Sequence, residues 1–369
     1  MAIIVSTEKK YITNINFFEA ESPLSSNIAD ATHNIPVIKF IIAEIELSNG
    51  LTGEGYLLSF HYSSNAIKGA LSDIKYFILK NNYEVSDTVK LYDDWINESE
   101  YFGNEGLLKW AIAIINIAMW DALGKLKSKS VLELLGGRKE KVEIYGSGGW
   151  LSYSDEELIE EVRSYKNRGF RSVKIKVGSS DVERDIQRLR KVRKAVGNEV
   201  RIMMDANQGM EYEDAFLLAK EAAKIGVDWF EEPFNHRNYS SYKKLKKETN
   251  IKIAMGEREY DFEALKQLAK NKSLDLWQPD LLRIGGVEKW IESAKLADTY
   301  KIPTLPHYYK DYDVPLLCAI NNGYAVESFD WIDGLIDNKL EIVDGYTFPR
   351  DGFGWGFSFL KERLIKLPI

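Results

Sequence analysis

Residues 172–178 read Ser-Val-Lys-Ile-Lys-Val-Gly and residues 201–207 read Arg-Ile-Met-Met-Asp-Ala-Asn, with an amphipathic stretch at 181–196 between them. Short β-rich runs predict buried strands, and a helical stretch between two such runs is typical of parallel strands. Each run ends in an ionisable residue, Lys176 in the first and Asp205 in the second. This strand-helix-strand unit is where the fold prediction begins.

The same unit repeats from residue 142 to residue 326. Further β-rich runs and helical stretches alternate with it, and the predicted strands are 142–145, 172–177, 200–204, 228–230, 252–255, 274–277, 302–305 and 324–326. The predicted helices include 155–168, 181–196, 211–225 and 287–300. Eight strands with intervening helices predict an α/β fold, a (β/α) barrel of the modified TIM type. Periodicity alone leaves a doubly wound open sheet as the alternative.

The first 135 residues have a different pattern and predict an N-terminal α+β capping domain. Two β-rich runs, 37–47 and 52–58, flank the hairpin signal Asn49-Gly50, and three helical stretches follow. The last of these, 107–127, is apolar on almost every face and should be buried. We therefore predict a capping domain at 1–135, the barrel at 136–343, and a C-terminal segment at 344–369. That segment should contain loops and a final helix and pack back on the capping domain.

Composition excludes several functional classes. The chain has 369 residues, 49 Lys and Arg against 56 Asp and Glu, a net charge of −7 and a single Cys. An acidic chain is not attracted as a whole to nucleic acid or to anionic membranes, so neither is an expected partner. Residues 1–10 lack the apolar core of a secretory signal, and one Cys cannot form an intramolecular disulfide. We expect a cytoplasmic protein.

Ionisable residues end most of the predicted strands. They follow one another at intervals of about one strand-helix unit: Lys176, Asp205, Glu231, Glu257, Asp280, His307 and Glu327. In a barrel the carboxyl ends of the strands meet at one mouth, where active sites of this fold lie. In an open sheet they would be spread along an edge.

Three of these residues are carboxylates on successive strands, Asp205, Glu231 and Glu257. Carboxylates that are brought together repel one another unless a cation lies between them. An all-oxygen ligand set suits Mg²⁺, with Mn²⁺ as the second choice, and the absence of a nearby Cys disfavours zinc. The sequence therefore predicts a magnesium site.

Acid-base residues are predicted beside that site. Lys174 and Lys176 share one face of their strand, because side chains alternate along it. Two neighbouring ammonium groups near a divalent cation should lower the pKa of Lys176 toward the range of a general base. Asp280 and His307, on neighbouring strands, could form a dyad in which the carboxylate fixes the tautomer of the imidazole.

Taken in order, these residues stand in motifs that resemble those of the enolase superfamily, mandelate racemase subgroup. The motifs are Lys174-Ile-Lys176, Asp205-Ala-Asn207, Glu231-Glu-Pro233, Gly256-Glu257, Gln278-Pro-Asp280, Arg283-Ile-Gly-Gly286, Pro306-His307 and Val326-Glu327. The resemblance extends over nearly the whole chain. It implies a barrel with a capping domain, Mg²⁺ as cofactor, and removal of the proton α to the carboxylate of a small substrate.

The resemblance also implies roles for individual residues. Asp205, Glu231 and Glu257 would bind Mg²⁺, and Asn207 would help to hold the substrate. Lys176 would be the base on one face, supported by Lys174, and His307 with Asp280 would serve the other face. Glu327 would donate a hydrogen bond to the substrate carboxylate, and must be protonated to do so.

The reaction and the substrate are less closely specified. The run Tyr145-Gly-Ser-Gly-Gly149-Trp-Leu-Ser152 is similar to acid-sugar dehydratases of this subgroup, so dehydration of a polyhydroxy acid is favoured, with Ser147 as a substrate contact. Racemisation or epimerisation of a 2-hydroxy acid is the alternative. The specificity loops of the family correspond roughly to 16–34 and 52–63, and Tyr56 is our candidate substrate contact there.

Two other interpretations differ in class. A nucleotide-binding α/β protein is suggested only by Gly146-Ser-Gly-Gly149, which lacks the third glycine of the dinucleotide fingerprint. A barrel with a vestigial site, acting as a scaffold, fits the composition equally well, but no expected catalytic position is substituted. Many members of the subgroup are homo-oligomers, so we expect one here.

Overall fold

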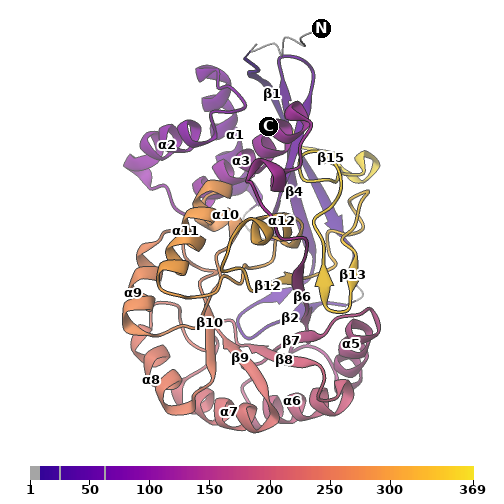
Figure 1. Ribbon diagram of the computed structural model, residues 1–369, viewed down its shortest axis with the longest axis vertical. Helices are drawn as coiled ribbons and strands as arrows, with labels where there is room; N and C mark the ends of the chain where they lie inside the picture. The colour runs from indigo at the N-terminus through magenta and orange to yellow at the C-terminus, as the bar shows by residue number, and fades with distance from the viewer. Residues whose placement is uncertain (1–8, 25, 62–63) are drawn as a thin grey trace.

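The computed structural model describes residues 9–24, 26–61 and 64–369. Its N-terminal part is an antiparallel sheet covered by helices (Figure 1). The long strands are β1 (Ile12–Ser22), β4 (Ile38–Leu47) and β5 (Thr52–Leu58), in the order β15-β1-β4-β5. The hairpin predicted at Asn49-Gly50 joins β4 to β5, with Gly50 at a φ of 81°. The small strands β2 (Ile28–Ala29) and β3 (Asn34–Ile35) form a separate ribbon.

The helices of this part are α1 (Ser64–Asn81), α2 (Thr88–Ser99), η1 (Glu100–Phe102), α3 (Leu107–Lys127) and α4 (Val131–Leu134). Helix α3 is long and apolar enough to cross a membrane, but it lies in the core against β5, with 72% of its most apolar window buried. The two elements approach closely at glycines. A Cβ atom on Gly55 would lie 2.7 Å from the carbonyl oxygen of Ile114, and one on Gly53 would lie 2.2 Å from that of Ala118.

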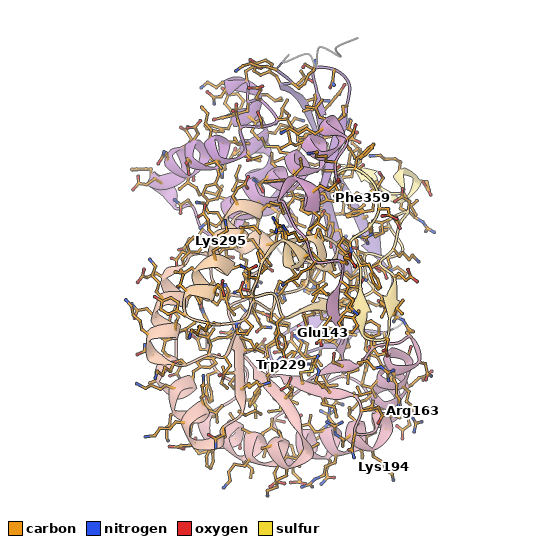
Figure 2. The ribbon with its side chains drawn as sticks, in the orientation of Figure 1. Glu143, Arg163, Lys194, Trp229, Lys295 and Phe359 are labelled. Atoms are coloured by element: carbon orange, nitrogen blue, oxygen red, sulfur yellow. The ribbon has the colours of Figure 1, made fainter. Side chains whose placement is uncertain are left out.

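The second part begins at β6 and consists of parallel strands with helices on the outside (Figure 1). Its strands are β6 (Val142–Gly148), β7 (Ser172–Lys176), β8 (Arg201–Asp205), β9 (Val227–Glu231), β10 (Lys252–Met255), β11 (Leu276–Trp277) and β12 (Ala325–Ser328). Its helices are α5 (Asp155–Asn167), α6 (Val182–Val196), α7 (Tyr212–Ile225), α8 (Tyr239–Thr249), α9 (Glu263–Asn271), α10 (Leu281–Ile284), α11 (Val287–Thr299) and α12 (Lys310–Ala319). Figure 2 shows Arg163 and Lys194 on the outer helices and Trp229 inside the ring of strands.

The ring of strands closes, which excludes the open sheet. Strands β6 to β11 pair in sequence order, and β12 returns to pair with β6. The predicted strand 302–305 is not a regular strand, but separate bridges hold it in the ring: Thr304 bridges Trp277 on one side and Gly323 on the other, and His307 bridges Asp280. Pro303 and Pro306 have no N–H to donate, so the pairing here is reduced to these separate bridges.

Large side chains fill the interior of the ring. Trp229 is fully buried and packs edge-to-face against Tyr145, with ring centroids 5.5 Å apart. The same cluster contains Met203, Ala254, Leu276, Leu305 and Ala325. This packed layer lies before the strand ends, so only the carboxyl ends of the strands are left to form a site.

The C-terminal segment differs from the prediction of a final helix. Residues 344–369, all of which the structure describes, contain β14 (Tyr346–Thr347), a short 3₁₀ turn η2 (Lys361–Arg363) and β15 (Ile365–Lys366), but no α-helix. β14 pairs with β6 of the barrel and, on its other side, with β13 (Ile342–Val343), whereas β15 pairs antiparallel with β1. Backbone pairing with the N-terminal sheet outweighs the helical propensity of these last residues.

Candidate active site

A cavity of about 280 Å³ lies at the carboxyl ends of the barrel strands. Five of the predicted site residues line it: Lys176, Asn207, Glu257, Asp280 and His307. The N-terminal part completes the wall with Asp30, His33, Ile35 and Leu58 to Phe60. The cavity therefore draws on both parts of the chain, and it lies where the sequence predicted a site.

Two lysines of β7 hold the neighbouring carboxylates. Lys174 Nζ lies 2.7 Å from Glu231 Oε1 and 2.6 Å from Glu327 Oε1, and Lys176 Nζ lies 2.6 Å from Asp205 Oδ2. All five side chains are almost completely buried. The two lysines reach the same cluster because side chains two residues apart share a face of a strand.

The charges of this cluster bear on two expectations. Burial lowers the pKa of Lys176, but the attraction of Asp205 outweighs it and the net direction is upward; the lowering expected from the sequence requires a divalent cation beside the lysine pair and stays a prediction. Burial likewise raises the pKa of Glu327, but Lys174 and His307 outweigh it and the net direction is downward. Glu327 is thus an ion-pair partner of Lys174 in this structure, and its expected role as a protonated donor to a substrate carboxylate stays a prediction. It also accepts a hydrogen bond from the backbone N–H of Tyr308.

The three predicted metal ligands lie at adjacent strand ends. Asp205 and Glu231 are paired in register, and burial together with repulsion by Asp205 raises the pKa of Glu231 to about 8. For Glu257, burial is outweighed by His307 and Arg258, and its pKa is lowered. These oxygen donors, two of which repel each other, are of the type that suits a hard divalent cation.

The described residues nevertheless form no ready cage for a metal: among them, no three acidic, histidine or cysteine side chains converge on one point. Basic side chains neutralise the carboxylates pairwise instead, since Lys176 pairs with Asp205 and Lys174 with Glu231. Glu257 lies 3.0 Å from Arg258 Nε and 3.3 Å from His307 Nε2. The donor chemistry fits Mg²⁺, and a bound cation would have to replace ammonium contacts.

His307 and Asp280 meet at the mouth of the barrel, where a parallel bridge pairs their backbones. His307 Nδ1 lies 2.8 Å from Asp280 Oδ2, while Asp280 Oδ1 accepts hydrogen bonds from the backbone N–H groups of Leu282 and Arg283. Burial lowers the pKa of His307, but Glu257 and Asp280 outweigh it and raise the pKa overall. Asp280 is thus fixed as the N-cap of α10, and it orients the imidazole.

The predicted substrate contacts have different positions. Asn207 lines the cavity at a φ of 41°, and its buried Oδ1 has no hydrogen-bond partner. Tyr56 does not line the cavity: it is buried, its hydroxyl donates to Asp311 Oδ2, and the prediction that it binds substrate is corrected. Ser147 is buried and is paired with Lys174 in the register of β6 and β7. It too lies outside the cavity lining.

Several lining residues were not singled out from the sequence. An aromatic wall, defined as Phe60, Trp150, Tyr308, Phe329 and Trp331, forms one side of the cavity. Three of them, Phe329, Trp150 and Trp331, follow the ends of β12 and β6 by one to three residues, and Tyr308 follows the predicted site residue His307; position is the only signal that could have indicated them. Asp30 and His33 come from the predicted specificity segment 16–34, and Phe60 from 52–63. Ser25, Tyr62 and Ser63 of those segments lie outside the described residues.

A closed β/α ring with an α+β cap, a lysine, and an Asp-His pair at one mouth defines a barrel enzyme of the proton-transfer type. Comparison with known families agrees with this class. Residues 157–363 match the enolase C-terminal domain-like family, and residues 13–136 match the N-terminal domain of mandelate racemase and muconate lactonizing enzyme. The chain belongs to the mandelate racemase/muconate lactonizing enzyme family of the enolase superfamily.

Individual relatives are similar over most of their length. Arabinonate dehydratase of Saccharolobus solfataricus is 29% identical over 87% of this chain and 88% of its own. D-galactarolactone cycloisomerase of Agrobacterium fabrum is 30% identical over 96% and 98%. The crystal structure of L-talarate/galactarate dehydratase from Salmonella typhimurium, liganded with Mg and L-lyxarohydroxamate, has a TM-score of 0.91 at 26% identity, covering 100% of this chain and 97% of that one.

Proposed function

We propose that this protein is a Mg²⁺-dependent acid-sugar dehydratase. It would remove the proton α to a carboxylate and expel the β-hydroxyl, giving a 2-keto-3-deoxy acid. The observation that carries the proposal is that Lys176 and the His307–Asp280 pair line one cavity from different strands. Relatives that dehydrate arabinonate and talarate or galactarate support it.

Asp205, Glu231 and Glu257 would hold the metal. When bound, Mg²⁺ would stabilise the negative charge that develops on the substrate carboxylate. Since Lys176 contacts Asp205, a cation at that carboxylate would weaken the attraction that raises the pKa of Lys176. The amine would then be better able to accept a proton.

The remaining residues would move or position protons. Lys176 Nζ would take the α-proton, and His307 Nε2 would deliver a proton to the departing hydroxyl. Asp280 would keep the Nδ1 proton of His307 in place. Lys174 holds Glu231 and Glu327 in position, and the free Oδ1 of Asn207 would accept a hydrogen bond from a substrate hydroxyl.

Racemisation or epimerisation of a 2-hydroxy acid is the second candidate. It is favoured by the same observation, because two groups able to exchange a proton line one cavity. It differs in outcome, since the proton returns to the opposite face and no hydroxyl is lost. We also propose a cytoplasmic setting, in line with a buried free Cys318, and a homo-oligomer that binds a small carboxylate but neither nucleic acid nor membrane.

A library of sugar monoacids and diacids, assayed for 2-keto-3-deoxy product with Mg²⁺ and with EDTA, tests the proposal. We expect product with Mg²⁺ from at least one acid, and loss of product in EDTA that Mg²⁺ reverses. Lys176→Ala and His307→Asn should both abolish dehydration. Product formation that EDTA leaves unchanged would contradict the proposal, and exchange of the α-hydrogen with D₂O without dehydration would favour the racemase.

A further inference from the structure

We propose that the cavity selects a sugar acid with one carboxylate and an apolar, deoxy-type far end over the corresponding diacid. The inference rests on the proposed function for the identity of the reacting end of the substrate. It goes further by assigning the chemistry of the other end, and it follows from the distribution of aromatic and charged side chains around the cavity.

The aromatic wall is continuous from the base outward. Lys176 Nζ lies 5.3 Å over the ring of Trp150, which stacks on Trp331 with centroids 5.8 Å apart. Trp331 in turn stacks on Phe329 at 4.4 Å and meets Phe60 edge-on at 5.9 Å. A bound chain that extends from Lys176 along this wall meets ring faces, which suit C–H and methyl groups better than a carboxylate.

The guanidinium groups of the cavity lie at the reacting end. Arg258 Nε lies 3.0 Å from Glu257 Oε1 and 3.4 Å from Glu232 Oε2, so carboxylates already neutralise it. Arg283 donates a hydrogen bond of 2.6 Å to the carbonyl oxygen of Glu257 and lies over the ring of Trp110. Both arginines are thus gathered around the predicted metal ligand Glu257.

The N-terminal part brings a negative charge to the cavity. The side chain of Asp30 is only 7% exposed and lies 3.1 Å from His33 Nδ1. Burial raises the pKa of Asp30, but His33 and Lys176 outweigh it and lower the pKa, so the carboxylate is ionised at neutral pH. A buried anion beside the cavity repels a second substrate carboxylate, whereas it can accept hydrogen bonds from hydroxyl groups.

Matched substrates provide the test. A panel of hexonates, their 6-deoxy analogues and the hexarates of the same configuration would be compared on the Mg²⁺-loaded enzyme. For acids that react, kcat/KM is measured; for acids that do not, Kd is measured by titration calorimetry. We expect the best hexonate or 6-deoxyhexonate to exceed its hexarate at least tenfold in kcat/KM or in affinity. A hexarate that equals or exceeds its partners overturns the inference.

Two variants test which side chains determine the substrate selectivity. Asp30→Asn should raise kcat/KM or affinity for the hexarate, and so reduce the ratio of deoxy acid to hexarate at least threefold. Trp331→Ala should reduce the same ratio by weakening the binding of the deoxy acid. Phe348→Ala, which changes an exposed aromatic residue outside the cavity lining, should leave the ratio unchanged. A ratio that neither Asp30→Asn nor Trp331→Ala alters would contradict the assignment. Absence of any 2-keto-3-deoxy product would refute the proposed reaction. The ratio of the Kd values measured by calorimetry would still decide between monoacid and diacid selectivity.

Discussion

Glu161 on α5 accepts a hydrogen bond of 2.5 Å from the backbone N–H of Gly149, the residue that follows β6. The carbonyl oxygen of Gly149 in turn accepts hydrogen bonds from the backbone N–H of Lys176 and from Arg188. Trp150, the next residue, lines the cavity. A carboxylate on an outer helix is therefore linked through one residue, Gly149, to the backbone of the base and of the aromatic wall.

Burial of the Glu161 carboxyl group, which outweighs the opposite effect of this hydrogen bond, should make stability depend on pH. Burial raises the pKa of Glu161 to about 7, while an unfolded glutamate titrates near 4.5. The folded state thus binds the extra proton between these values, and the free energy of unfolding should fall as pH rises through them. Relative to wild type, Glu161→Gln should gain about 1–3 kcal/mol between pH 5 and pH 8, allowing for partial exposure of the carboxyl group.

Urea unfolding at pH 5, 6, 7 and 8 measures this difference. Glu160→Gln, which changes the neighbouring exposed carboxylate on the same helix, is the matched control and should show no such trend. A constant difference between Glu161→Gln and wild type over this range would refute the assignment.

Two glycines should respond oppositely to the same substitution. A Cβ atom on Gly55 would press against the backbone of α3, so Gly55→Ala should destabilise the protein by about 1–3 kcal/mol. Gly69 lies exposed in α1 with nothing within 4 Å of a Cβ atom, so Gly69→Ala should stabilise it by about 0.5–1 kcal/mol. Denaturant midpoints of the two variants measure the contrast, and equal midpoints would contradict the close contact between β5 and α3.

The variant Asp280→Asn tests whether Asp280 orients the imidazole of His307, without disturbing the fold. Asparagine also caps helices well, so α10 should be retained and the circular dichroism spectrum unchanged. The imidazole would lose the carboxylate that fixes its tautomer, and we expect kcat for dehydration to fall about 10²- to 10⁴-fold. Asp298→Asn, on the exposed face of α11, is the control and should turn over normally. Undiminished kcat in Asp280→Asn would remove the dyad from the mechanism.

Magnesium binding should depend on Glu231 and should stabilise the fold. At a Mg²⁺ concentration of about 100 times Kd, binding adds about 2.7 kcal/mol to the free energy of unfolding, so Tm should rise with Mg²⁺ and fall with EDTA. Calorimetry should show at least tenfold weaker Mg²⁺ binding for Glu231→Gln than for wild type. Glu263→Gln, an exposed carboxylate in α9, should bind as wild type does, and equal binding by both variants would exclude Glu231 as a ligand.

The sequence was sufficient to predict the ring of strands and the residues at its mouth, because ionisable side chains stand at or near the carboxyl ends of most strands. It was not sufficient where a distance across the fold decides the outcome. The ion pair of Glu327 depends on Lys174 lying 2.6 Å away, and the loss of Tyr56 as a contact depends on Asp311 of α12. Neither relationship is encoded in local pattern.

The predicted strand 302–305 and the predicted final helix failed for related reasons. Both were inferred from local propensity, but the first is interrupted by residues that cannot donate a hydrogen bond. In the second, β15 pairs with β1, which lies more than 340 residues earlier in the chain. Pairing between distant segments overrides local preference, and a single sequence does not reveal its partner.

That distant pairing has a consequence for biosynthesis. The outermost strand of the N-terminal sheet is β15, and Lys75 in α1 also holds the backbone oxygen of Ile369. A ribosome makes β1 before the barrel and β15 after it, so the capping sheet must wait with an open edge until the barrel has been translated. Truncation of the last few residues should therefore expose that edge and promote aggregation of the nascent protein, even though the barrel itself would be complete.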